Sequence, residues 1–225
     1  MMLSAVLFDM DGLMFDTEAL NLRAWAAAGE GHGYAITPEV MHDQIGLSLP
    51  KTRSMMQERF GPAFDFDLVR GDRIRWTERW IEEHCLPEKP GLRRLLAWLI
   101  ERRIPRAMAT SSDRGIVGFY LKHTDVGECF DRILTGDRVE RGKPAPDIFL
   151  KAALELGADP AGCVVLEDSY NGIRAAHAAG MMPVMVPDLL PPTPEIAALT
   201  YRVVGSLNDV IPVLEALADD RKPER

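Results

Sequence analysis

The stretch LFDMDGLMFDTE, residues 7–18, decides the fold class, because it joins an apolar strand, a group of carboxylates and the start of a helical region. The segment 5–8 is apolar at every position, which is typical of a buried strand in a parallel sheet. Asp9 and Asp11 follow it two positions apart, so in an extended chain both side chains project to the same side. Like charges at that spacing raise one another's pKa unless a positive charge lies between them. The stretch therefore predicts a bound cation at the end of the first strand.

Outward from this stretch, the chain has two regions of different character. After Asp16 the pattern is helical over 17–29, 49–60 and 65–85, and Pro87, Pro90 and Gly91 end this region. From residue 91 onward, helical segments (91–103, 112–124, 147–157, 169–180, 207–218) alternate with strands (104–110, 130–136, 163–168, 182–187, 201–205). This alternation predicts an α/β fold with a doubly wound, Rossmann-like parallel sheet that binds ligands at the carboxyl ends of its strands.

The two regions predict a domain organisation. We expect an α/β core domain over residues 1–16 and 89–218, and a smaller all-helical cap domain, inserted after the first strand, over residues 17–88. Residues 219–225, rich in charge, are expected to form a disordered tail.

Polar residues also follow other strands of the predicted sheet. Thr110, Ser111 and Ser112 end one strand, and Glu167 and Asp168 end another. A loop lysine, Lys143, precedes a helix whose Pro146 suits a first-turn position. Carboxylates are hard oxygen ligands that suit Mg²⁺, and amides at a helix start with a threonine hydroxyl suit a phosphoryl group. Together they predict a magnesium and phosphate site.

Each of these motifs alone has a simpler interpretation. D-x-D after a strand is usually a loop or a helix cap, and T-S-S-D is usually a helix N-cap. A lone loop lysine is usually solvated, and Glu-Asp before a helix is usually a favourable charge pair. Their order along the chain and their matched positions at strand ends favour one catalytic site.

The motifs DMDGLMFDTE, ATSSD, GKPAPDIF and LEDSYNG resemble, in order, the four motifs of the haloacid dehalogenase superfamily. The helical insertion after the first motif resembles that of its β-phosphoglucomutase-like phosphatases, and the resemblance covers residues 4–210. By this resemblance Asp9 is the nucleophile that forms an aspartyl phosphate, and Asp11 is the general acid and base.

The resemblance also implies the supporting roles. Thr110, with Ser111 beside it, binds phosphate, and Lys143 orients and offsets charge. Asp168 binds Mg²⁺ together with Asp9 and the backbone carbonyl of Asp11, and Glu167 supports the site. The expected activity is Mg²⁺-dependent hydrolysis of a small phosphorylated metabolite, such as a sugar phosphate, by positioning and electrostatic stabilisation of the phosphoryl group.

Three other functions share parts of this pattern. A 2-haloacid dehalogenase also uses an aspartate nucleophile, but attacks carbon and needs no Mg²⁺. A phospho-accepting signalling receiver is shorter and lacks a helical insertion, and a silent scaffold would lack part of the catalytic set.

The fourth alternative is a β-phosphoglucomutase-type mutase. Those mutases carry a histidine where this chain has Asn21, and an arginine after Gly-x-Ser where it has Leu49, with Lys51 as a displaced substitute.

Composition limits the partners. A formal net charge of −8 argues against nucleic acid and anionic membranes, and no apolar run approaches the roughly 20 residues of a membrane span. Cys85, Cys129 and Cys163 form no C-x-x-C and are expected to be reduced, mostly buried thiols of a cytoplasmic protein. The oligomeric state stays open, with a monomer favoured.

Overall fold

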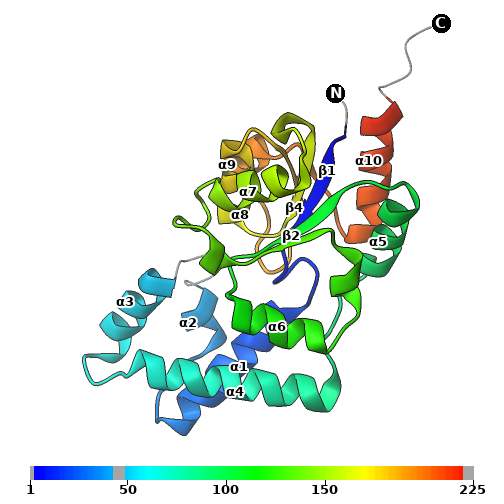
Figure 1. Cartoon of the computed structure of the whole chain (residues 1–225). Helices are drawn as coiled ribbons and strands as arrows, with labels where there is room; N and C mark the ends of the chain where they lie inside the picture. The colour runs from blue at the N-terminus through cyan, green and yellow to red at the C-terminus, as the bar shows by residue number, and fades with distance from the viewer. Residues whose placement is uncertain (1–2, 43–48, 220–225) are drawn as a thin grey trace, which may run out of the picture. The chain divides into compact units, whose positions relative to one another are not determined.

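The computed structural model describes residues 3–42 and 49–219. Residue contacts divide the chain into two compact units (Figure 1). The first, here called the α/β unit, consists of Met1–Asp16 and Pro87–Arg225, and the second, the helical unit, consists of Thr17–Leu86. The role of the helical unit as a cap stays a prediction.

The α/β unit contains one parallel sheet. Its strands are β1 (Ala5–Phe8), β2 (Arg106–Ala109), β3 (Arg132–Leu134), β4 (Cys163–Glu167), β5 (Met182–Met185) and β6 (Arg202–Val203). They pair in the order β3-β2-β1-β4-β5-β6, and every pairing is parallel. The predicted fold class is therefore confirmed, and each strand lies inside its predicted segment. β1 and β4 are buried at every position, which explains why both are apolar except for Glu167 at the end of β4.

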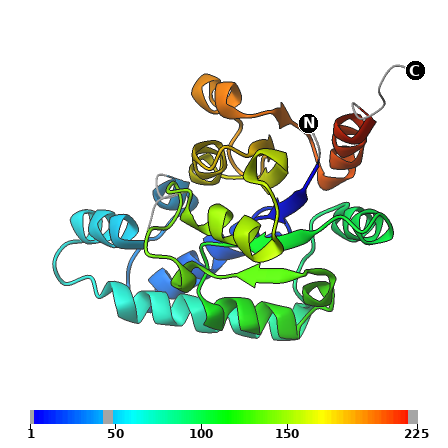
Figure 2. The same cartoon turned by 45° about the horizontal axis from the view of Figure 1, so that its top comes forward.

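Helices cover both faces of this sheet, as Figure 2 shows. They are α5 (Leu92–Glu101), α6 (Arg114–Lys122), α7 (Asp147–Leu156), α8 (Tyr170–Ala178), α9 (Pro194–Leu199) and α10 (Val210–Asp219), with 3₁₀ turns η1 (Val126–Cys129), η2 (Gly136–Arg138), η3 (Pro160–Gly162) and η4 (Leu207–Asp209). α7 and α8 bury Phe149, Ala152 and Ala176 against Leu7 and Val165 of the sheet. α10 includes Asp219, so the predicted tail begins one residue too early, and its remainder, 220–225, lies outside the described residues.

The register of the strands determines which residues meet at the carboxyl end of the sheet. Phe8 of β1 pairs with Leu166 of β4 and with Met108 of β2. The next residue of each strand, including Asp9 and Glu167, therefore lies at one level. This level falls where β1 and β4 separate the two halves of the sheet, the switch point at which such folds bind ligands.

The helical unit has a core of its own. Its helices are α1 (Thr17–Gly31), α2 (Pro38–His42), α3 (Leu49–Phe60) and α4 (Phe66–His84). Trp25, Met56 and Phe66 are buried together in one cluster. Asp65 begins α4 by accepting a hydrogen bond from the Leu68 amide, so its side chain satisfies one of the free N–H groups of the first turn. The three long helices agree with the helical pattern of the sequence.

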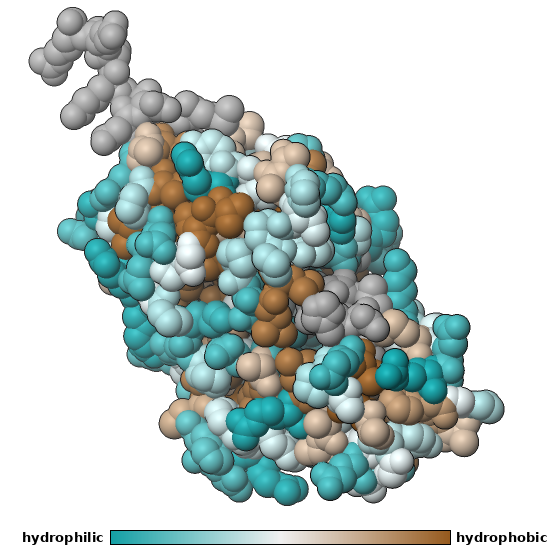
Figure 3. All heavy atoms as spheres, turned by 180° about the vertical axis from the view of Figure 1, so that it is seen from behind, coloured by the Kyte–Doolittle hydropathy of each residue, from teal (hydrophilic) through white to brown (hydrophobic). Residues whose placement is uncertain are grey.

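The surface seen in Figure 3 is mostly hydrophilic, with apolar side chains in separate groups. No helix within the described residues is long and apolar enough to cross a membrane. The three cysteines are free thiols, but the prediction that they are mostly buried is wrong for Cys85, which is exposed at the end of α4. Cys163 is fully buried in β4, and Cys129 is half-buried.

Candidate active site

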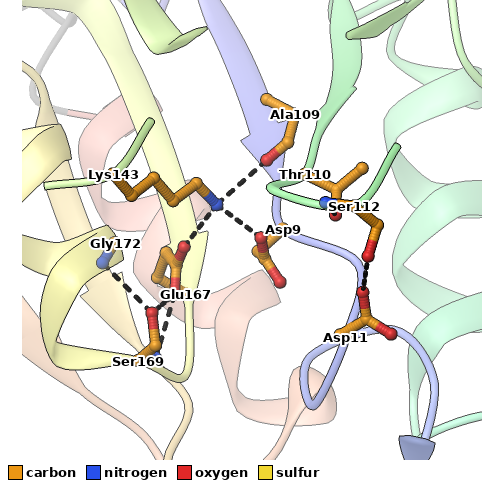
Figure 4. Close-up of polar contacts among 9 residues, drawn as sticks. All are labelled: Asp9, Asp11, Ala109, Thr110, Ser112, Lys143, Glu167, Ser169 and Gly172. Carbon is orange, nitrogen blue, oxygen red and sulfur yellow. Dashed lines mark hydrogen bonds and ion pairs between the residues drawn. The ribbon is translucent and has the colours of Figure 1, made fainter. Parts of the chain in front are cut away.

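Residues from four separate segments meet at the carboxyl end of the sheet (Figure 4). Asp9 follows β1, Thr110 follows β2, Lys143 comes from the loop before α7, and Glu167 ends β4. All four are almost completely removed from solvent. The structure thus brings together residues that the sequence places up to 158 positions apart, as the separation of Asp9 and Glu167 shows.

Lys143 connects the parts of this site. Its ammonium group donates to a carboxylate oxygen of Asp9, to Glu167 Oε1 at 2.6 Å and to the Ala109 carbonyl at 3.0 Å (Figure 4). A lysine ammonium has three donors, and each one has an acceptor here. The side chain is 5% exposed, so its position is fixed by these three bonds and by the Phe149 ring, 4.8 Å from Nζ.

Burial and the opposite charge of the partner have opposing effects on the pKa values of Asp9 and Lys143. Burial, together with the charges of Glu167 and Asp11, raises the pKa of Asp9 to about 8, although Lys143 lowers it. Burial lowers the pKa of Lys143, but the charges of Asp9 and Glu167 outweigh burial and raise it. Lys143 therefore stays protonated at neutral pH.

Both carboxylate oxygens of Glu167 are held by hydrogen bonds within the site. Its Oε1 accepts from Lys143, and its Oε2 accepts from the Ser169 amide at 2.9 Å and the Ser169 hydroxyl at 2.8 Å. Ser169 in turn begins α8 by accepting from the Gly172 amide at 3.1 Å. A Cβ on Gly172 would lie 1.8 Å from Glu167, so only glycine leaves room for the carboxylate.

Asp168 lies next to the loop that follows β1. A Cβ on Gly12 would lie 2.3 Å from Asp168 Oδ2, and Gly12 has φ +78°, a conformation that glycine adopts without strain. Both observations require glycine at position 12. The chain of this loop can therefore approach Asp168 closely, with the Asp11 carbonyl next to the same turn.

The carboxylates fit a divalent cation. Asp9, Glu167 and Asp168 each offer an oxygen, and these oxygens lie within 4.8 Å of one another. Oxygen atoms of carboxylates and carbonyls are the ligands that Mg²⁺ prefers. Because both oxygens of Glu167 already accept hydrogen bonds, Asp9 and Asp168 are the carboxylates best placed to bind an ion.

Asp11 and Asp9 have different partners. Asp11 Oδ2 accepts a hydrogen bond of 2.7 Å from the Ser112 hydroxyl, away from Lys143 (Figure 4). The Ser112 amide donates to Thr110 Oγ1 at 3.0 Å. Ser112 therefore fixes both Asp11 and Thr110, and the turn between β2 and α6 belongs to the same polar network.

The start of α6 differs from the sequence prediction. We expected the amides of Ser111 and Ser112 at the first turn of this helix, but α6 begins at Arg114, and Asp113 provides its N-cap by accepting from the Ile116 amide. Ser111 is exposed in the preceding turn. The aspartate of T-S-S-D is the preferred capping residue, and this moves the helix two residues away from the serines.

The sequence did not indicate Ser169 and Gly172 as members of the site, and it indicated Ser112 only as a phosphate-binding amide and not as the partner of Asp11. Ser169 and Gly172 both lie in the quoted motif LEDSYNG, directly after the acidic pair, but no local pattern shows that they hold Glu167. Ser112 lies beside Thr110 in ATSSD, and only the fold shows that it reaches a residue 101 positions away.

The family of haloacid dehalogenase-like hydrolases matches residues 3–180. The chain belongs to this family. A relative from Thermotoga maritima, named "Phosphorylated carbohydrates phosphatase", is 30% identical over 214 residues, which cover 95% of this chain and 91% of the relative. The predicted family is confirmed, and the chain is a phosphatase-type hydrolase.

Solved structures agree with this assignment. CbbY from Rhodobacter sphaeroides, solved in complex with phosphate, superposes with a TM-score of 0.79 at 28% identity and covers 93% of this chain and 96% of its own. A structure from Thermotoga maritima that carries a provisional β-phosphoglucomutase name has the same TM-score and identity, and covers 95% of this chain and 99% of its own. The β-phosphoglucomutase-like subgroup is thereby supported as the place of this chain in the family.

Proposed function

We propose that this protein hydrolyses a small phosphorylated metabolite with the help of Mg²⁺, through an aspartyl phosphate on Asp9. The observation that carries the proposal is the buried Lys143 ammonium, which bridges Asp9 and Glu167 beside Asp168. A buried lysine that faces several carboxylates orients a nucleophile and leaves an excess of negative charge, which a divalent ion offsets.

Asp9 and Asp11 divide the chemistry. In the first step an Asp9 oxygen bonds to phosphorus, the bond from phosphorus to the ester oxygen breaks, and Asp11 gives its proton to the leaving oxygen. In the second step water attacks phosphorus, Asp11 takes its proton, and the bond to Asp9 breaks to release phosphate. The Ser112 hydroxyl, 2.7 Å from Asp11, keeps this carboxyl away from Lys143 and in one orientation.

The remaining residues hold the phosphoryl group. Thr110 and the amide of Ser111 would bind its oxygens, and Lys143 would offset their charge. Asp9, Asp168 and the Asp11 carbonyl would hold Mg²⁺, whose bound charge stabilises the phosphoryl oxygens. Glu167 positions Lys143 through the 2.6 Å bond and does not touch the substrate.

A phosphorylated carbohydrate is the substrate class that we favour. The Thermotoga maritima relative named as a phosphatase of phosphorylated carbohydrates covers 95% of this chain, so the likeness includes the helical unit as well as the α/β unit. The test is a phosphate-release screen over sugar phosphates, sugar-alcohol phosphates and nucleotides, with Mg²⁺ present.

The screen is run with two aspartate variants. Asp9→Asn keeps the shape of the side chain but cannot form the aspartyl phosphate, and we expect it to lose nearly all activity with a native circular dichroism spectrum. Asp131→Asn makes the same change before β3, at the opposite edge of the sheet, and should keep parental activity. Activity of Asp9→Asn within tenfold of the parent would overturn the proposal.

The mutase is the second candidate, because one structural neighbour carries that name. We infer hydrolysis from two departures, Asn21 in α1 and Leu49 at the first position of α3. Leu49 cannot grip a second phosphate, and the preceding residues, 46–48, lie outside the described part of the chain. The test supplies hexose 1-phosphate with a trace of the 1,6-bisphosphate and follows free phosphate and hexose 6-phosphate. Faster accumulation of hexose 6-phosphate would establish the mutase.

A further inference from the structure

A fourth strand end, that of β5, brings another carboxylate toward the site. Asp188 follows β5, whose end is fixed to β4 by a 2.8 Å bond from the Val186 amide to the Glu167 carbonyl. The Asp188 side chain is only 9% exposed. Such a buried carboxylate requires compensation, because removing an ion from water is costly unless it is paired and hydrogen-bonded.

One oxygen of Asp188 has this compensation. Lys89 Nζ donates to Asp188 Oδ1 at 2.6 Å, and the same ammonium lies 3.6 Å from Asp16. Burial lowers the pKa of Lys89, but the hydrogen bond and the charge of Asp188 outweigh burial and raise it. Lys89 is thus a protonated partner that fixes the orientation of Asp188.

The other oxygen has no such partner. Asp188 Oδ2 is buried, and no group within the described residues donates a hydrogen bond to it. Gly12 shows where this oxygen lies. A Cβ added to Gly12 would lie 3.3 Å from Asp188 Oδ2 and 2.3 Å from Asp168 Oδ2. The two carboxylate oxygens therefore border one small space beside the loop that carries Asp11.

We propose that Asp188 is a positioning residue of the magnesium site, where Oδ2 accepts hydrogen bonds from water molecules bound to the ion. The proposal rests on the proposed function, since it requires Mg²⁺ beside Asp9 and Asp168. Mg²⁺ keeps several of its waters in protein sites, and these waters are donors. A buried carboxylate oxygen without a donor, beside a carboxylate that suits the ion, supplies the acceptor that they need.

A purely structural role predicts different behaviour. If Asp188 only anchored Lys89, its loss would lower stability equally with and without Mg²⁺. If Asp188 orients the bound waters, its loss weakens the binding of Mg²⁺ itself. Outer partners of a metal site change metal affinity by about 10-fold to 100-fold when they are removed.

The experiment measures Mg²⁺ binding to the whole protein by calorimetry, together with the rise of the thermal midpoint that Mg²⁺ causes. For Asp188→Asn we expect a dissociation constant about tenfold higher and a smaller rise of the midpoint. Glu155→Gln is the matched control, because it also removes one negative charge from an ion pair. This pair, Glu155 with Arg138, lies near Pro105 at the opposite edge of the sheet. The dissociation constant of this control should stay within twofold of the parent.

A second variant, with both members of the ion pair replaced, tests the same proposal if Asp188→Asn does not fold. Lys89→Met with Asp188→Ala removes the whole ion pair without changing net charge or leaving a buried ion unpaired, and it should also bind Mg²⁺ more weakly than the parent. Binding within twofold of the parent by either folded variant would overturn the role of Asp188. Failure of the parent itself to bind Mg²⁺ would instead overturn the proposed function on which this inference rests.

Discussion

Gly172→Ala tests whether the position of Glu167 controls the site. The added Cβ would lie 1.8 Å from Glu167 Cδ and from Oε1, far inside van der Waals contact. Glu167 is completely buried between Lys143 and Ser169, so it has no free space in which to move. The substitution must shift the Glu167 carboxylate, which is the group that Lys143 binds.

Two opposing effects set the magnitude. Alanine is a better helix former than glycine, which stabilises α8 by at most about 1 kcal/mol. Displacing the Glu167 carboxylate breaks its buried ion pair with Lys143, which costs about 3–5 kcal/mol. We therefore expect Gly172→Ala to lower the free energy of unfolding by about 2–4 kcal/mol. For a chain of this size, that loss lowers the thermal midpoint by roughly 5–15 °C.

Thermal unfolding followed by circular dichroism measures the effect, with phosphate release measured on the same samples. Gly118→Ala is the control, because Gly118 is exposed inside α6 and nothing lies within 4 Å of its added Cβ. This variant should be more stable than the parent by about 0.5–1 kcal/mol. Combining Gly172→Ala with Glu167→Asp, whose shorter side chain leaves room, should recover part of the lost stability. A Gly172→Ala protein as stable as the parent would refute the reasoning.

Three further predictions follow from the site and the thiols. Excess chelator should abolish phosphate release and added Mg²⁺ should restore it, whereas full activity in chelator contradicts the metal role. Ser112→Ala should lower turnover about tenfold, because Asp11 loses the 2.7 Å hydrogen bond from the Ser112 hydroxyl, while the thermal midpoint stays within a few degrees. At pH 8, iodoacetamide should modify exposed Cys85 in the native protein, and mass spectrometry should find Cys163 modified only after denaturation, because burial raises the pKa of its thiol to about 11.

The sequence predicts the α/β unit well because its signals are local. The strands β1, β4 and β5 lie in short, mainly apolar runs bounded by turn residues, and each of the six strands lies inside its predicted segment. α2 and α9 were missed because five and six residues are too few for a periodic pattern, although Thr193 and Pro194 are clear start signals for α9.

The polar contacts could be predicted only in part. A polar residue after a strand marks the edge of the sheet, and this rule found the residues after β1, β2 and β4. The same rule applied to β5 would have indicated Asp188, which follows MPVMVP directly. Its partner Lys89 lies 99 positions away in the segment that ends the helical insertion, and no local pattern connects the two.

Lys89 also links the site to the places where the chain leaves and re-enters the α/β unit. The Asp16 amide donates to the Pro87 carbonyl at 2.9 Å, and the Lys89 amide donates to the Met14 carbonyl at 2.9 Å. These two bonds hold the outgoing and returning segments together as a short antiparallel pair, beside the Phe15–Glu88 bridge. The Lys89 side chain extends from this pair to Asp188, so an ion pair joins the returning segment to the proposed metal site.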